Sequence, residues 1–352
     1  MKKLLLFGGF LCIVLFANAQ SKSKQYSVRT IAFYNVENLF DTINNPLKND
    51  EASPMMKLKV NKSKVYWDKI EKLGNVISQI GFELTKTGPA IIGISEIENK
   101  AVLEDLVKSK FLKKMNYEII HYESPDKRGI DVALLYQKKY FKPIHHESFT
   151  PTIFRNNFRV YTRDQLLVSG YLDDELIHVI VNHWPSRSGG EAATRILREK
   201  AAFQNVKIIE KIRKTSPKAK IFSIGDFNDG PTNSSFKKVL KTKGNKKKVT
   251  ENDLYNPFEK MAKRGLNTTG YRDNINLFDQ IFFTSQVLDK GEKNYSTYKM
   301  FKANIFNKRF LITKKGRFKG YPFRSFSNGK YTGGFSDHYP VYIYLIKEKK
   351  RN

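Results

Sequence analysis

The sequence IFSIGDFNDGP at residues 221–231 decides how the fold is interpreted. Its opening apolar residues predict a buried strand, while Gly225 and Gly230-Pro231 are typical of turns. Asp226 and Asn228 stand where this strand ends, at the rim of a sheet, where α/β proteins build their sites. Asp and Asn are also ordinary turn residues. The pair therefore gains weight only if similar side chains end other strands.

The same classes of side chain recur at the ends of other predicted strands. They are Asn35 and Glu37 after residues 30–36, Glu96 after 90–95, His183 after 176–182, Asp279 before 280–283, and Asp337 and His338 before 339–346. An amphipathic helix predicted over 66–80, with Trp67 and Ile70 on its apolar face, joins the first two of these strands. A strand–helix–strand unit of this kind brings both acidic strand ends to a shared edge.

This set of side chains favours one kind of chemistry. Carboxylates without cysteine suit a hard divalent cation, Mg²⁺ or Mn²⁺. A zinc site is disfavoured because the sequence has no clustered histidine spacing, and a serine hydrolase because no G-x-S-x-G motif occurs. A metal together with His, Asp and Asn matches phosphodiester hydrolysis, in which charge is neutralised and a proton is moved.

Residues 1–19 have the pattern of a signal peptide: Lys2 and Lys3, an apolar stretch over 4–16, and small residues before a cleavage site near Ala19. The alternative, a membrane anchor, is disfavoured because the apolar stretch is too short. We therefore expect export to the periplasm or the extracellular space, with no membrane anchor after cleavage. Cys12 is the only cysteine, so the mature chain must be held by its core rather than by disulfides.

The remaining residues, 20–352, are predicted to form one catalytic domain with a basic aromatic insertion at 291–334. The insertion holds eleven Lys or Arg, ten Phe or Tyr, and one acid, Glu292. Its rings could stack on nucleic-acid bases, or they could pack on the body of the domain while the lysines face solvent. Packing is the simpler interpretation of the rings, and binding of a polyanion is the simpler interpretation of the charge.

The net charge is +29, from 63 basic and 34 acidic residues. A field of this strength attracts polyanions, such as nucleic acid, anionic lipid surfaces or phosphorylated small molecules. Solubility alone is the competing explanation. We expect a polyanionic substrate, with nucleic acid favoured, and a monomeric enzyme.

At this point the chain resembles a known family. In order along residues 30–346 it carries the blocks NVENLFD at 35–41, ISEIE at 94–98, RGIDVA at 128–133, NHWPSR at 182–187, GDFN at 225–228, FDQI at 278–281 and SDH at 336–338. Each block is weak alone, but seven in order are specific. They resemble the endonuclease/exonuclease/phosphatase superfamily, the fold of deoxyribonuclease I and exonuclease III. The resemblance implies an α+β fold, a four-layer α/β/β/α sandwich of two mostly antiparallel sheets flanked by helices.

The resemblance also implies roles for single residues. It assigns the metal to Glu96, helped by Asn35 and Glu37, with Asp337 beside it. It assigns the chemistry at the phosphate to Asp226, Asn228, His183 and a His338 held by Asp279. Arginines could grip the substrate phosphate bidentately, or could form ordinary surface ion pairs; the candidates are Arg187, Arg128, Arg163, Arg195 and Arg198.

The function expected from the sequence is an exported Mg²⁺-dependent phosphodiester hydrolase, in the first place a nuclease for DNA or RNA. The first alternative is a phosphatase or phosphodiesterase for phosphoinositides or phospholipid headgroups on the same fold. The second is a polyanion-binding protein without catalysis, which would not need Glu96, Asp226 and His338.

Overall fold

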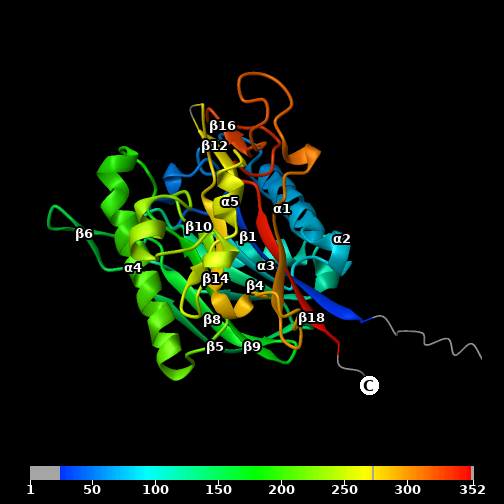
Figure 1. Ribbon diagram of the computed structural model, residues 1–352. Helices are drawn as coiled ribbons and strands as arrows, with labels where there is room; N and C mark the ends of the chain where they lie inside the picture. The colour runs from blue at the N-terminus through cyan, green and yellow to red at the C-terminus, as the bar shows by residue number, and fades with distance from the viewer. Residues whose placement is uncertain (1–23, 272, 350–352) are drawn as a thin grey trace, which may run out of the picture.

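Two six-stranded sheets form the centre of the computed structural model, which describes residues 24–271 and 273–349 (Figure 1). The predicted signal peptide, residues 1–19, lies outside the described residues. The first sheet has the order β15 (Lys299–Ile305), β18 (Val341–Glu348), β1 (Tyr26–Leu39), β2 (Ile91–Ile97), β4 (Asp131–Gln137), β3 (Tyr117–His121). The second sheet has the order β11 (Leu254–Tyr255), β14 (Asp279–Thr284), β10 (Ile221–Asp226), β9 (Glu175–His183), β8 (Gln165–Leu172), β5 (Phe141–Phe149).

Both sheets follow one plan. A parallel pair lies at the centre of each, β1 with β2 and β10 with β9, and antiparallel strands flank it on both sides. Three small hairpins extend from the sheets: β6 (Ile153–Arg155) with β7 (Phe158–Val160), β12 (Thr269–Tyr271) with β13 (Asn274–Asn276), and β16 (Phe326–Ser327) with β17 (Lys330–Tyr331). The predicted two-sheet α+β sandwich is confirmed.

Helices cover the outer faces of the sheets (Figure 1). α1 (Lys62–Gln79) and α3 (Lys100–Lys108) pack on the first sheet, and α4 (Glu191–Thr215) packs on the second. The remaining helices are the short α2 (Phe82–Thr85) and α5 (Phe258–Ala262), five 3₁₀ turns at Asp50–Ala52, Lys113–Met115, Lys246–Lys248, Ser285–Val287 and Arg309–Leu311, and a π turn at Ser235–Val239. Among the described residues, no helix is both long and apolar enough to cross a membrane.

The period of two in each strand divides the core into layers. On β1, Ile31 and Phe33 face the second sheet, while Ala32 and Tyr34 face the helices. Gly93 lets the two sheets approach closely, since a Cβ there would meet Ile224 Cδ1 of the second sheet at 2.8 Å. Burial of apolar surface on both faces of each sheet supplies the main stabilisation of a chain of this size.

One local expectation needs correction. Trp67, expected on the apolar face of α1, is 49% exposed, and the neighbouring Tyr66 is buried in its place. The helix begins four residues earlier than predicted, at Lys62, and its buried stripe reaches Tyr66, which lies four residues before Ile70 on the same face. The lysine-rich stretch over 237–248 exposes its seven lysines and contains two short helical turns, and its Lys237 pairs with Glu259 at 2.8 Å.

Candidate active site

The predicted polar side chains gather at one end of the two sheets. The second sheet delivers three of them by regular pairing, because Asp226 lies opposite His183 on one side and opposite Asp279 on the other. Phe222 and Ile224 precede Asp226 on the inward face of β10, so alternation alone aims all three side chains between the sheets.

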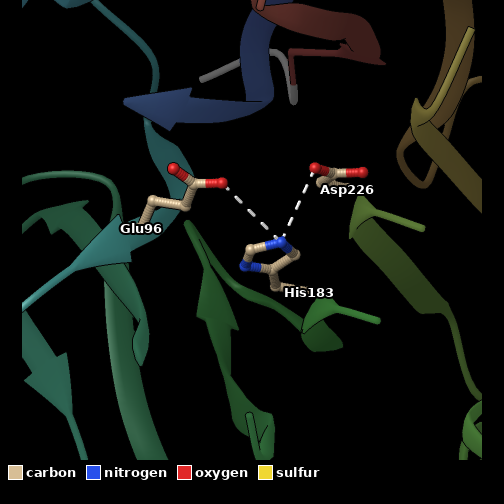
Figure 2. Close-up of side chains that lie close together, drawn as sticks. All are labelled: Glu96, His183 and Asp226. Atoms are coloured by element: carbon tan, nitrogen blue, oxygen red, sulfur yellow. Dashed lines mark ion pairs between the residues drawn. The ribbon is translucent and has the colours of Figure 1, made fainter. Parts of the chain in front are cut away.

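Asn35 joins the two sheets. Its Nδ2 donates hydrogen bonds to Glu96 Oε1 and to Asp226 Oδ2, each at 3.1 Å. Figure 2 shows His183 between the same two carboxylates, with its Nε2 3.9 Å from Glu96 Oε1 and 3.7 Å from Asp226 Oδ2. Four side chains from β1, β2, β9 and β10 thus converge on one point, as predicted from their strand ends.

A second histidine approaches Asp226 from the other side. Nδ1 of His338 lies 2.7 Å from Asp279 Oδ2, and its Nε2 lies 3.8 Å from Asp226 Oδ2. The backbone before β18 is held in place, because Ser336 Oγ donates to the Asn35 carbonyl and accepts from the His338 amide. Asp279 therefore fixes the orientation of His338, which is the relation expected from the resemblance.

The first sheet reaches the site through irregular backbone. The pairing of β1 with β2 shifts register between Asn35 and Leu39, and that of β2 with β4 shifts between Ser95 and Ile97. Glu37, Asn38 and Glu96 have φ values of 51°, 50° and 63°. Non-glycine residues in this left-handed region store strain and are typical of functional sites.

Burial and mutual charge shift the titration of the cluster. Burial raises the pKa of Asp226 to about 6, against the opposing effect of His338. Burial alone would lower the pKa of His338, but Asp279 and Asp226 outweigh it and hold that pKa well above its ordinary value. Burial, together with the nearby Arg163 and Arg128, holds the pKa of His183 well below its ordinary value. One histidine is thus kept charged and the other neutral.

These residues fit a divalent cation. Glu96, His183 and Asp226 can each turn one ligand atom toward a common point, with those atoms within 4.8 Å of one another; Asp226, Asp279 and His338 form a second such group. Nδ1 of His183 is buried and has no partner among the described residues. Carboxylate oxygens, with an amide beside them, are donors that suit Mg²⁺ or Mn²⁺. Such an ion would neutralise charge on a phosphate held between the sheets.

Two predicted metal ligands have other partners. The Glu37 carboxylate accepts hydrogen bonds from the backbone amides of Ser325 at 2.5 Å and Phe326 at 3.2 Å. Asp337 pairs with Arg324 at 2.7 Å. Burial, followed by Asp337, raises the pKa of Glu37 to about 7, and burial, again followed by Asp337, raises the pKa of Glu96. Direct ligation by either carboxylate stays a prediction.

The predicted phosphate-binding residues are placed less directly. Asn228 adopts a left-handed φ of 49°, and its side-chain amide donates to the Trp184 carbonyl at 3.0 Å. Arg187 donates to the Asn228 carbonyl at 2.8 Å and pairs with Asp229 at 3.1 Å. Its guanidinium therefore supports the loop that carries Asn228. Arg128 is exposed, and it pairs with Asp126 at 3.2 Å.

The other candidate arginines have structural partners. Arg163 is buried and donates to Asp126 and to the carbonyls of His183 and Trp184. Arg198 pairs with the buried Asp229 at 2.6 Å, and Arg195 lies on the surface 3.6 Å from Glu199.

Two cations near the site were not expected from the sequence. Lys69 of α1 is fully buried, and its Nζ donates to Ser325 Oγ at 2.5 Å. Burial lowers its pKa to about 8. Arg324 links Asp337 to the segment that Glu37 holds. The one sequence signal was the periodicity of α1, which places Lys69 beside the apolar Ile70 and gives no reason to expect a buried charge.

Solved structures share this fold. TDP2 from D. rerio, solved with a single-strand DNA product, aligns with a TM-score of 0.52 at 15% identity, over 91% of this chain and 99% of that one. The human Nocturnin catalytic domain aligns with a TM-score of 0.51 at 13% identity, over 93% and 97%. A mannosyl-6-phosphatase from Bacteroides thetaiotaomicron aligns with a TM-score of 0.50 at 16% identity, over 90% and 99%. No curated protein sequence matches the chain.

These solved structures share the fold of the chain, and a sequence-family model identifies its family. The model of the Endonuclease/Exonuclease/phosphatase family matches residues 30–347, which is nearly the whole of the described chain. The seven sequence blocks lie within that range, and the cluster around Asp226 is assembled from them. The chain therefore belongs to the endonuclease/exonuclease/phosphatase family, and it is a metal-dependent phosphoric ester hydrolase.

Proposed function

We propose that the protein is an exported nuclease that uses Mg²⁺ or Mn²⁺ to hydrolyse the phosphodiester bonds of DNA or RNA. The observation that carries the choice of substrate is a basic hollow beside the catalytic cluster. This cavity of about 410 Å³ reaches from Arg128 and Arg163 to Pro185, two residues after His183, and it is also lined by Lys127, Arg155 and Arg159. A run of cations next to a hydrolytic centre suits a substrate that carries phosphates on both sides of the reacting bond.

In the proposed mechanism, each side chain has one task. His338, charged and held at Nδ1 by Asp279, presents Nε2 to a non-bridging phosphate oxygen and stabilises the charge that develops there. Asp226 accepts a proton from the attacking water, for which its pKa of about 6 is suited. Asn35 keeps the carboxylates of Asp226 and Glu96 at a fixed separation. Neutral His183 lies between the same two carboxylates and adds no positive charge to them.

Export is proposed on the basic start and apolar stretch of residues 1–19. The full chain has a net charge of +29, and cleavage of residues 1–19 would remove Lys2 and Lys3 and leave +27, so the exported enzyme would attract polyanions outside the cytoplasm. Nucleic acid is the polyanion that fits a phosphodiesterase site, and we propose that the enzyme works on it as a monomer.

The first test is a plasmid and single-stranded oligonucleotide assay with Mg²⁺, with EDTA, and with Asp226→Asn. We expect nicking or degradation that EDTA and the substitution both abolish, and binding that weakens steeply with salt. Release of phosphate from inositol phosphates, with intact nucleic acid, would replace the nuclease by a headgroup phosphatase. Metal-independent retention of DNA without hydrolysis of any phosphoester would leave only a binding protein.

A further inference from the structure

A second cavity, lined by aromatic and basic side chains, opens beside the catalytic cluster. It has a volume of about 540 Å³, and it is formed by the end of β12, residues 313–324 and the β16–β17 hairpin. Tyr271, Phe318, Tyr321 and Phe323 supply its rings, and Arg317 and Arg324 supply its charge. We call these six residues the ring pocket.

The ring pocket is physically joined to the active site. Asp337 lies in its wall, directly before the catalytic His338. Arg324 spans the junction, because its guanidinium donates to Asp337 at 2.7 Å while the residue lines the cavity. A phosphate bound at Asp226 and His338 would therefore place its neighbouring substituent at the mouth of the pocket.

The rings of the pocket are at least partly exposed to solvent. Elsewhere in the 291–334 segment several rings enter the core, among them Tyr298, Phe306 and Phe326. Phe318, in contrast, is 45% exposed, and its ring centroid lies 5.8 Å from that of Tyr321. Apolar surface left in water beside an active site indicates a ligand that covers it.

The wall behind these rings is shaped to hold them. Gly270 lies against Tyr321, because a Cβ at this position would meet the Tyr321 ring at 2.5 Å. The missing side chain lets the ring lie close to β12. Arg317, paired with Asp273 at 2.7 Å, has its guanidinium carbon 5.9 Å from the centroid of the Phe318 ring. The pocket therefore offers flat apolar surface beside two guanidinium groups, each of which is paired with a carboxylate.

We propose that the ring pocket holds the base of the nucleotide next to the bond that is cut. The inference rests on the proposed nuclease function and narrows it. A base inside a duplex is stacked on both of its faces, so it can lie against Phe318 only if it is unstacked. The substrate is thus single-stranded nucleic acid, or an unpaired strand end.

The lining favours a base over a sugar. A hexose needs donors and acceptors for several hydroxyl groups. The carboxylate of Asp337 in the wall is already paired with Arg324. The hydroxyl groups of Thr313 and Thr332 already donate to backbone carbonyls at 3.2 and 3.1 Å, which leaves Ser327 as the lining serine or threonine hydroxyl without such a bond among the described residues. Aromatic rings and a guanidinium can instead stack on any base without reading its sequence.

The test separates the pocket from the catalytic site. In EDTA, fluorescence anisotropy would measure binding of a labelled single-stranded oligonucleotide and of the same strand with a central tract of abasic residues. With Mg²⁺, kcat/KM would be measured for both. We expect wild type to prefer the base-containing strand by about tenfold in each assay. Phe318→Ala should remove most of this preference, and Phe318→Trp should keep it.

A matched control is available in the same segment. Phe301 on β15 is 57% exposed and lies outside the pocket, so Phe301→Ala should leave the preference unchanged. Equal preference in wild type and Phe318→Ala, with cleavage intact, would overturn the ring pocket but not the nuclease. Cleavage of no nucleic acid, or an effect of Phe318→Ala on a hexose 6-phosphate alone, would overturn both.

Discussion

The two sheets share one plan but reach the active site differently. At the end of the second sheet, β9, β10 and β14 stay in register, and Asp226 faces both His183 and Asp279. At the end of the first sheet, β1 and β2 both break register, and left-handed residues appear at Glu37, Asn38 and Glu96. The regular sheet supplies the residues proposed to act on the proton and the phosphate. The irregular sheet supplies Glu96, the residue first expected at the metal.

The irregularity has a geometric reason. On β2, Ile92 and Ile94 face the helices, so uninterrupted alternation would turn Glu96 toward the same apolar layer. The extra residue of a bulge returns Ile97 to that layer and frees Glu96 to point at Asn35. A carboxylate is thus moved from one face of a sheet to the other by a local change in backbone.

The largest effect is expected at the regular end. Asp226→Asn should lower kcat by between about 10² and 10⁴, because it removes the proposed proton acceptor while keeping the size of the side chain. Steady-state hydrolysis of an oligonucleotide would measure it. Glu147→Gln, which changes an exposed carboxylate on β5, is the control. A loss of less than tenfold would show that Asp226 does not carry the proton.

Substitutions of Glu96 and Glu37, the two glutamates at the irregular end, should differ in their effects on activity and stability. Glu96→Gln should lower kcat by at least about 10² and raise the Mg²⁺ concentration needed. Glu37→Gln should cost less than about tenfold in kcat. It should lower the free energy of unfolding by about 1–3 kcal/mol, because two buried amides each donate to a different oxygen of Glu37 and glutamine offers only one acceptor oxygen. Equal losses of activity in both variants would make Glu37 a metal ligand.

A second buried histidine of β9, His178, should make the stability of the protein depend on pH. Burial lowers the pKa of His178 to about 4. Below its ordinary pKa the unfolded chain takes up a proton that the folded chain refuses, so stability should fall as the pH drops from about 6.5 to about 4. His178→Gln should remove about 2–3 kcal/mol of that loss. Urea unfolding at both ends of this range would measure it, with exposed His145→Gln as the control.

The smallest effect concerns the strain of the bulge. Asn38 has a φ of 50°, and its amide donates to Glu96 Oε2 at 3.0 Å. Asn38→Val should lower the free energy of unfolding by about 1–2 kcal/mol, because a β-branched residue resists this backbone. Asn38→Gly should leave it nearly unchanged. Urea titration of both variants tests this, and equal stability would mean that the left-handed turn is not strained.

The sequence predicted the regular end better than the irregular one, and the reason is physical. Asp226, His183 and Asp279 follow from alternation, which a short apolar run reveals. The direction of the Glu96 side chain depends on a bulge, and the hydrogen bonding of Glu37 depends on contact with Ser325, 288 residues away. Arg324 and Lys69 come from segments whose patterns carry no sign of the site. Trp67 was misplaced because residues three and four positions before Ile70 both lie near its face of the helix, so the apolar spacing does not choose between Trp67 and Tyr66.

The contact of Glu37 with the amides of Ser325 and Phe326 has a consequence for engineering. It anchors the segment beside the ring pocket to the strand that carries Asn35. A loop taken from a relative to change substrate preference would stay attached at this point only if two of its backbone amides donate to the Glu37 carboxylate. In such a chimera, residue 37 and residues 324–326 should therefore be replaced together.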